Sequence, residues 1–236
     1  FNTLRCVEHI RLDISYQQLP VVIVGVGGGL SYASLNASHH ALEDIAYLRC
    51  MPGMTVVCPA DAWETRAAIR AAMAINTPIY IRLGKKNEPT VHDDVPDFKI
   101  GRAMQLEEGK DVCLIGTGVI LPNCLAAARM LHEKGISAAV VNMHTVKPLD
   151  EGTLQHVFSD YSLVVTIEEH GIAGGLGGAV AEWLSANPAH RSRLLRLGTS
   201  DVFMYEAGEQ EHARNFFGLG EDQICQSVLD AYESGA

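Results

Sequence analysis

The chain has 236 residues, of which 47% are hydrophobic and 19% are charged, a composition that allows one large or two ordinary globular domains. Its formal charge of −10 argues against a nucleic-acid backbone or an anionic membrane surface as its partner. The sequence contains no run near the roughly 20 apolar residues that a membrane helix needs, and no leader that resembles a signal peptide.

Strand-like apolar runs alternate with helical patterns, which predicts parallel sheets with helices on both faces. In the first part of the chain we expect helices near residues 3–16, 41–51 and from 61 onward, and strands at 20–26, 54–58 and 78–83. Asp61 is placed to cap its helix, and Glu64 is placed to complete a capping box. Because three strands are few for a doubly wound sheet, we expect a domain that is incomplete at its N-terminus.

A segment without periodicity divides the chain. Residues 84 to about 98 are charged and contain prolines, as linkers do, so we place the domain boundary near residue 95 and expect domains at 1–95 and 96–236. In the second domain we expect strands near 111–116, 137–142, 162–167 and 193–197, and helices over Leu121–Leu131 and near 150–158, 176–186 and 221–233. The predicted fold class is α/β, with two doubly wound, mostly parallel sheets.

The stretch VVIVGVGGGL is a strand that runs into glycines. A dinucleotide-binding loop needs a third glycine, which lets the helix pack closely on the strand, and Leu30 stands at that position. We therefore favour a loop that crosses the carboxyl end of the sheet, where α/β proteins bind their ligands.

Two adjacent histidines, His39 and His40, precede the second predicted helix. Neighbouring side chains point in different directions, so we expect at most one of them to face a given site. A histidine at the carboxyl edge of a parallel sheet is well placed for proton transfer near neutral pH, although a helix-capping or interface histidine explains the pattern equally well. No third ligand has the spacing of a metal site, and we predict none.

Two further motifs lie at predicted strand ends. In PIYIRLGKK, Arg82 could hold a phosphate or carboxylate bidentately, and a structural ion pair is the alternative. In IEEHGIAGGLGG, a strand, an acidic pair, a histidine and a glycine turn lead into a helix. Its spacing does not match a P-loop, so we interpret it as a structural turn or an interface loop.

The six cysteines are scattered without a CxxC pair, mostly in apolar segments such as TVVCP. We expect them to be reduced core residues, which fits a cytoplasmic protein.

Taken together, these stretches resemble the transketolase family over nearly the whole chain. ASHHALEDIAYLRCMPGMTVVCPAD and PIYIRLG are similar to segments of its pyrimidine-binding domain, and residues 136–150 and 164–178 are similar to segments of its C-terminal domain. The nearest likeness is to the C-terminal subunit of split transketolases. Deoxyxylulose-phosphate synthases and 2-oxoacid dehydrogenase beta subunits resemble the chain more distantly.

The resemblance implies a subunit or fragment of an enzyme that uses thiamine diphosphate to transfer a two-carbon ketol unit from a ketose to an aldose. The cofactor would lie between this chain and a diphosphate-binding subunit or domain, which would hold the diphosphate and Mg²⁺, and the pair would form a homo-oligomer. The family's catalytic glutamate would lie before Phe1.

Three residues acquire roles through the resemblance. His39 matches the histidine that contacts the donor near its reacting hydroxyls, so it would move protons and orient the donor. Arg82 matches an arginine that binds the substrate phosphate. Phe1 lies near the aromatic residues that pack on the aminopyrimidine.

Two departures from the family affect the substrate. Relatives have an aspartate where this chain has Leu35, and a histidine where it has Gly27. Losing both polar anchors suggests a modified sugar or another unusual ketose in place of an ordinary pentose phosphate. The alternatives are a 2-oxoacid dehydrogenase-like beta subunit and a non-catalytic scaffold that lacks the catalytic glutamate.

Overall fold

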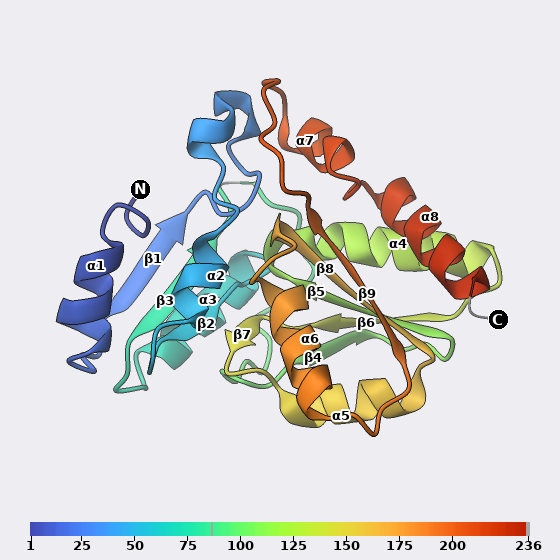
Figure 1. The fold of residues 1–236 in the computed structure, drawn as a ribbon, viewed down its shortest axis with the longest axis horizontal. Coiled ribbons are helices and arrows are strands. Elements are labelled where there is room, and N and C mark those ends of the chain that lie inside the picture. Colours follow the sequence, from blue (N-terminus) through green and yellow to red (C-terminus); the bar gives the residue numbers. More distant parts are fainter. Residues whose placement is uncertain (86, 235–236) are drawn as a thin grey trace.

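The computed structural model describes the whole chain except residues 86 and 235–236. Two mostly parallel sheets lie beside one another, with helices on their faces (Figure 1). The first sheet has the order β1-β3-β2-β7, with β1 at Val22–Val26, β3 at Ile79–Leu83, β2 at Thr55–Val57 and β7 at Thr145–Lys147. The second has the order β4-β6-β5-β8-β9, with β4 at Met104–Glu107, β6 at Ala138–Asn142, β5 at Val112–Thr117, β8 at Leu163–Gly171 and β9 at Arg193–Thr199. The predicted fold class is confirmed.

The helices follow the expected alternation. Before residue 95 they are α1 at Val7–His9, which continues as a π-helix at Ile10–Ser15, α2 at Asp44–Arg49 and α3 at Ala62–Ala72. After it they are α4 at Leu121–Glu133, α5 at Glu151–Asp160, α6 at Leu176–Ala186, α7 at Gln210–Phe216 and α8 at Glu221–Glu233. We call the elements before residue 95 the first unit and those after it the second unit. Within the described chain, no helix reaches the length and apolar content that a bilayer crossing requires.

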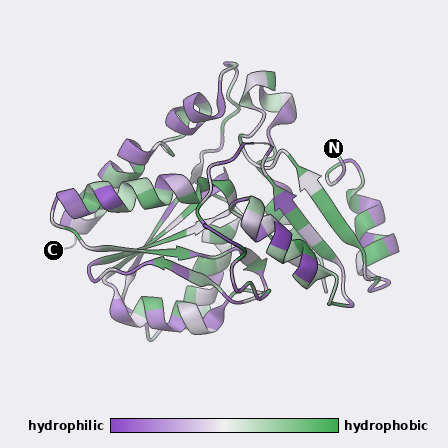
Figure 2. Ribbon diagram, turned by 180° about the vertical axis from the view of Figure 1, so that it is seen from behind, coloured by the Kyte–Doolittle hydropathy of each residue, from purple (hydrophilic) through white to green (hydrophobic). Residues whose placement is uncertain are grey.

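One strand of the first sheet comes from the second unit. β7 pairs antiparallel with β2, through Val57 with Thr145 and Val56 with Lys147, so this sheet has a fourth strand that the sequence did not predict. A core cluster also spans both sheets, since Tyr80 of β3 and Ile115 of β5 belong to it. Figure 2 shows hydrophobic residues along the strands of both sheets and hydrophilic residues on the outer helices. The two units therefore share one of the core clusters, and the boundary near residue 95 stays a prediction.

A buried polar contact also joins the units. Asp61 caps α3 as predicted, accepting a hydrogen bond from the Glu64 amide at 2.8 Å. The Glu64 carboxylate accepts from the Ala60 amide at 2.7 Å, one residue further back than in the predicted capping box. At the end of β6, the Asn142 side-chain amide donates to both Glu64 oxygens, at 2.9 and 3.0 Å. Glu64 and Asn142 are fully buried.

We expect Glu64→Ala to lower the free energy of unfolding by about 2–3 kcal/mol, because the buried amides of Ala60 and Asn142 lose their acceptor. Urea unfolding followed by circular dichroism measures the change. Glu133→Ala is the matched control, since Glu133 is exposed at the end of α4. Equal effects of the two substitutions would show that the buried contact contributes nothing.

Candidate functional site

A glycine loop forms the carboxyl edge of the first sheet. After β1 the chain turns across the end of β3, where the amides of Gly27 and Gly28 donate to the Leu83 carbonyl at 3.0 and 2.8 Å. Gly27 has a φ of 88°, which favours glycine. A Cβ atom on Gly28 would lie 2.7 Å from Cγ of Arg82, so the loop needs glycine to pass this close. The predicted crossing at the carboxyl end of the sheet is confirmed.

A cavity of about 350 Å³ opens at this edge. Its walls come from the turn at the N-terminal end of the chain, the glycine loop and α2. The side chains that bear on its chemistry are Phe1, Tyr32, His39, His40, Asp44 and Tyr47. A concave site that combines aromatic surface with a few titratable groups is the usual form of a small-molecule site.

The structure brings together two of the three residues that the resemblance singled out. The rings of Phe1 and His39 meet edge to face, with centroids 5.8 Å apart. Phe1 is 70% exposed and His39 is half-buried. The Ser38 hydroxyl lies 3.1 Å from Nδ1 of His39. An aromatic face and an imidazole therefore share one wall of the cavity.

His40 also borders the cavity, which corrects the expectation that at most one of the two histidines faces a site. The chain leaves a short 3₁₀ turn at 37–39 and becomes extended at His40, and the cavity follows this bend. Burial, and then the neighbouring His39, hold the pKa of His40 below its ordinary value. Because protonation is disfavoured, His40 is neutral at neutral pH.

Arg82 lies behind the cavity wall, and its expected contact with a substrate phosphate stays a prediction. It is only 5% exposed, and it is not one of the described residues that border the cavity. Its Nε donates to Oδ2 of Asp44 at 2.8 Å, and its Nη2 donates to the carbonyls of Ala41 and Glu169 at 2.6 and 2.9 Å. The geometry thus favours the alternative that the sequence left open, an internal ion pair.

Asp44 connects this ion pair to the cavity. It borders the cavity, is buried, and accepts hydrogen bonds from both Arg82 and the Tyr80 hydroxyl, the latter at 2.7 Å. Burial alone would raise the pKa of Asp44, but the charge and hydrogen bond of Arg82 outweigh it, and the pKa lies below its ordinary value. Burial, and then Asp44, raise the pKa of Tyr80. Asp44 is therefore a carboxylate held between a cation and a neutral phenol.

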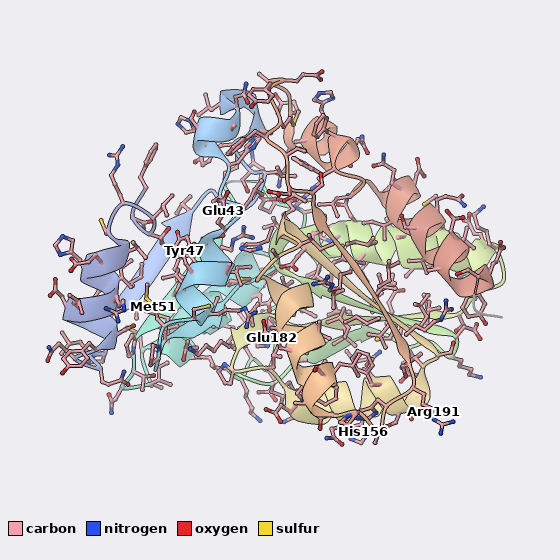
Figure 3. The ribbon with its side chains drawn as sticks, in the orientation of Figure 1. Glu43, Tyr47, Met51, His156, Glu182 and Arg191 are labelled. Atoms are coloured by element: carbon pink, nitrogen blue, oxygen red, sulfur yellow. The ribbon has the colours of Figure 1, made fainter. Side chains whose placement is uncertain are left out.

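Two tyrosines of the cavity were not predicted. Figure 3 shows Tyr47 on α2, between Glu43 at the N-cap and Met51 beyond the end of the helix. The Tyr47 hydroxyl donates to Oγ1 of Thr3 at 2.5 Å, and burial raises its pKa to about 12. The Tyr32 ring fills the space that a side chain at Gly27 would need. No short-range pattern marks Tyr32.

The position of Leu35 is also informative. Relatives were expected to carry an aspartate there, but Leu35 is 50% exposed and is absent from the residues that border the cavity. At Gly27, where relatives were expected to carry a histidine, the Tyr32 ring covers the cavity wall. An aromatic surface therefore stands where the resemblance leads us to expect a substrate-binding imidazole.

The IEEH motif, for which the sequence left a structural turn or an interface loop open, lies in β8 and contacts residues of both units. Glu168 accepts from the first amides of α6, at 2.6 Å from Leu176 and 2.8 Å from Gly177. Glu169 accepts from the Leu30 amide in the glycine loop at 2.9 Å, and Nε2 of His170 accepts from the Ala46 amide at 3.2 Å. Burial raises the pKa of Glu168 to about 7 and lowers that of His170 to about 4. Glu169 and His170, which are neighbours on β8, thus contact the glycine loop and α2, and both of these elements border the cavity.

One group of potential metal ligands lies away from the cavity. Ligand atoms of Asp61, Glu64 and His92 lie within 4.8 Å of one another. Every carboxylate oxygen in this group already accepts a hydrogen bond, those of Asp61 from the amides of Glu64, Val91 and His92, and those of Glu64 from Ala60 and Asn142. We therefore describe it as a hydrogen-bonded cluster and assign no metal to it.

Two family models match the chain. The model for the transketolase pyrimidine-binding domain matches residues 1–90, and the model for the transketolase C-terminal domain matches residues 101–224.

Individual relatives agree with these matches. A subunit of the apulose-4-phosphate transketolase of Phocaeicola vulgatus is 36% identical over 231 residues, which cover 98% of this chain and 73% of the relative. A 6-deoxy-6-sulfo-D-fructose transketolase subunit of a Clostridium species is 34% identical over 233 residues, which cover 99% of this chain and 71% of the relative. A solved split-gene transketolase, described as an inactive beta4 tetramer, is 37% identical with a TM-score of 0.89, covering 99% of this chain and 74% of that one.

Proposed function

Because this chain belongs to the transketolase family, we propose that it supplies the pyrimidine side of a thiamine diphosphate site and, with a diphosphate-binding partner subunit, transfers a two-carbon ketol unit from a ketose to an aldose. The observation that carries the proposal is the shared cavity of Phe1 and His39, in which an aromatic face lies beside an imidazole.

The residues of the cavity fit one end of the cofactor. An aminopyrimidine is flat and aromatic, and the exposed Phe1 ring offers a surface on which it can stack. The guanidinium of Arg5 lies 4.6 Å from the centre of that ring and already covers part of it. The cavity is bordered by one arginine, two histidines and two carboxylates, a poor donor set for a diphosphate with its metal. We therefore assign the diphosphate and Mg²⁺ to the partner subunit.

When bound, thiamine diphosphate would supply the nucleophile and the electron sink for carbon–carbon cleavage. His39 would accept and return a proton of the donor hydroxyls, since Ser38 contacts only Nδ1 and leaves the other ring nitrogen for substrate. Asp44, fixed by Arg82 and Tyr80, would keep the wall beneath the substrate rigid.

The substrate is proposed to be a phosphorylated or otherwise modified sugar. The names of two relatives specify apulose 4-phosphate and 6-deoxy-6-sulfo-D-fructose, neither of which is an ordinary pentose phosphate. Gly27 and the exposed Leu35 remove the two polar groups that the family resemblance leads us to expect, and Tyr32 adds an aromatic surface. These observations support an unusual ketose over xylulose 5-phosphate.

A second candidate is a non-catalytic scaffold subunit. The solved relative described as an inactive beta4 tetramer supports it, because a similar chain assembles there without activity. For this chain the two candidates differ in one respect, which is whether adding a diphosphate-binding subunit produces turnover.

A coupled assay tests the function. The protein would be mixed with its diphosphate-binding partner, Mg²⁺, thiamine diphosphate and ribose 5-phosphate as acceptor, and offered apulose 4-phosphate, 6-deoxy-6-sulfofructose, xylulose 5-phosphate or pyruvate. We expect ketol transfer from a modified ketose only when both subunits are present. Decarboxylation of pyruvate without ketol transfer would instead indicate a 2-oxoacid dehydrogenase-like enzyme, and no turnover at all would indicate a scaffold.

We expect Phe1→Ala to weaken thiamine diphosphate binding by the assembled pair about tenfold, because stacking on an aromatic ring contributes about 1–2 kcal/mol. Isothermal titration calorimetry measures the dissociation constant. Phe216→Ala is the matched control, since Phe216 is a partly exposed phenylalanine on α7. Unchanged affinity in Phe1→Ala would place the pyrimidine elsewhere.

A further inference from the structure

α2 begins without an ordinary cap. Its first amides have no intrahelical acceptor, and the side chain of Glu43, the residue at the N-cap, makes no capping hydrogen bond. The acceptor for the Ala46 amide comes from the second unit, where Nε2 of His170 lies 3.2 Å away. The imidazole of His170, 124 residues further along the chain, thus caps α2 in the way that a serine or aspartate at the N-cap usually does.

The hydrogen bonds of His170 favour one tautomer. Its Nδ1 lies 2.8 Å from the Gly171 carbonyl, so Nδ1 must carry the proton and Nε2 keeps a lone pair for the Ala46 amide. The ring is fully buried, and burial lowers its pKa to about 4. The charged groups that face it are Glu168 on its own strand, with an oxygen 3.9 Å from Nδ1, and Arg82 and Asp44 across the interface between the units.

α2 carries much of the cavity wall. Glu43, Asp44 and Tyr47 all border the cavity, and the Tyr47 hydroxyl ties the helix to Thr3 in the turn that holds Phe1. The helix has only six residues, so it depends on tertiary contacts for its position. Losing an acceptor at its first turn should therefore move the wall.

The neighbouring Glu169 acts on the opposite wall. Its side chain accepts from the Leu30 amide, and its carbonyl accepts from Arg82. The glycine loop and α2 are thus held by consecutive residues of one strand, β8, which pairs with β5 up to Glu168 and with β9 up to Ile167 and again at Gly171.

We propose that His170 is a positioning residue, whose neutral imidazole caps α2 and thereby holds the cavity wall in the geometry that receives cofactor and donor. The structural part of this inference concerns the chain alone. Its consequence for catalysis rests on the proposed function.

Two substitutions of His170 distinguish the loss of the hydrogen bond to the Ala46 amide from the loss of the imidazole ring itself. In His170→Asn the amide nitrogen can still donate to the Gly171 carbonyl, but nothing reaches the Ala46 amide. In His170→Gln the longer side chain places its carbonyl oxygen near the position of Nε2, where it can accept from Ala46. His156→Asn is the matched control, because His156 is exposed on α5, far along the second unit (Figure 3).

Amide hydrogen exchange of the protein alone gives the first measurement. We expect protection of the Ala46 amide to fall about 5- to 30-fold in His170→Asn, and to stay within about threefold of wild type in His170→Gln and His156→Asn. Unchanged protection in His170→Asn, or equal loss in His170→Gln, would overturn the proposal. If His170→Asn does not fold, His170→Gln decides alone, since it must keep both protection and fold.

Kinetics of the assembled pair give the second measurement. We expect His170→Asn to raise the KM for thiamine diphosphate about tenfold, with kcat at saturating cofactor within about threefold of wild type, and His170→Gln to restore the KM. A loss of kcat alone in both variants would contradict a positioning role. If the wild-type pair binds no cofactor, the proposed function fails, while the exchange result still tests the cap.

Discussion

His39→Ala is expected to lower kcat for ketol transfer by about 10²- to 10³-fold, with a free energy of unfolding within about 1 kcal/mol of wild type. The imidazole is half-buried at the cavity, and the Ser38 hydroxyl is its polar contact among the described residues, so little of the fold depends on it. Proton transfer by a positioned histidine contributes about 10²- to 10⁴-fold to a rate. Steady-state assays of the assembled pair and urea unfolding of the chain measure the two quantities.

The controls for His39 test position as well as residue type. His156→Ala removes an exposed histidine outside the cavity and should change neither quantity. His39→Gln keeps a polar side chain that can orient the donor but cannot carry a proton, so its kcat should stay as low as that of His39→Ala. If His39→Ala retained more than about a third of wild-type kcat, another group would have to move the proton.

Arg82→Ala is expected to destabilise the protein by about 3–5 kcal/mol, which is the usual effect of removing one partner from a buried ion pair. Arg82 and Asp44 are both almost fully buried, and the lost guanidinium also leaves the carbonyls of Ala41 and Glu169 without their donor. Denaturant unfolding measures the change. Lys99→Ala is the control, because both Lys99 and its partner Asp97 are exposed and such pairs contribute at most about 1 kcal/mol.

A double substitution separates an internal role of Arg82 from a role in substrate binding. In Arg82→Met with Asp44→Leu, no charge is left buried without a partner, so stability should largely return. If instead Arg82→Ala stayed as stable as wild type and only the KM of a phosphorylated donor rose, Arg82 would be a substrate ligand, as the family resemblance first implied.

Local patterns predicted most of the fold. α4 has its apolar positions at spacings of three and four, a proline in its first turn and Gly135 just beyond its end with a φ of 83°, and the sequence predicts it closely. Asp61 was correctly predicted as a cap. Strand β7 was not predicted, because its three residues carry too short a pattern to distinguish a strand from a loop, and its pairing with β2 is set by tertiary structure.

The site was less predictable than the fold, because its contacts join residues far apart in sequence. Arg82 at a strand end could equally hold a ligand or an internal acid, and only the folded chain shows Asp44, 38 residues earlier, against it. The IEEH motif was interpreted as a structural turn or an interface loop, and no local pattern showed that its histidine reaches the first turn of α2. Phe1 and His39 received separate roles through the family resemblance, and their shared cavity supports those roles.

The central claim is that this chain provides one wall of a thiamine diphosphate site and a partner provides the other. Calorimetric titration of thiamine diphosphate with Mg²⁺ into the protein alone, the partner alone and their equimolar mixture tests it most directly. We predict saturable binding of a single cofactor per pair in the mixture, with far weaker binding by either subunit alone. Equally tight binding by the partner alone, or none in the mixture, would contradict the claim.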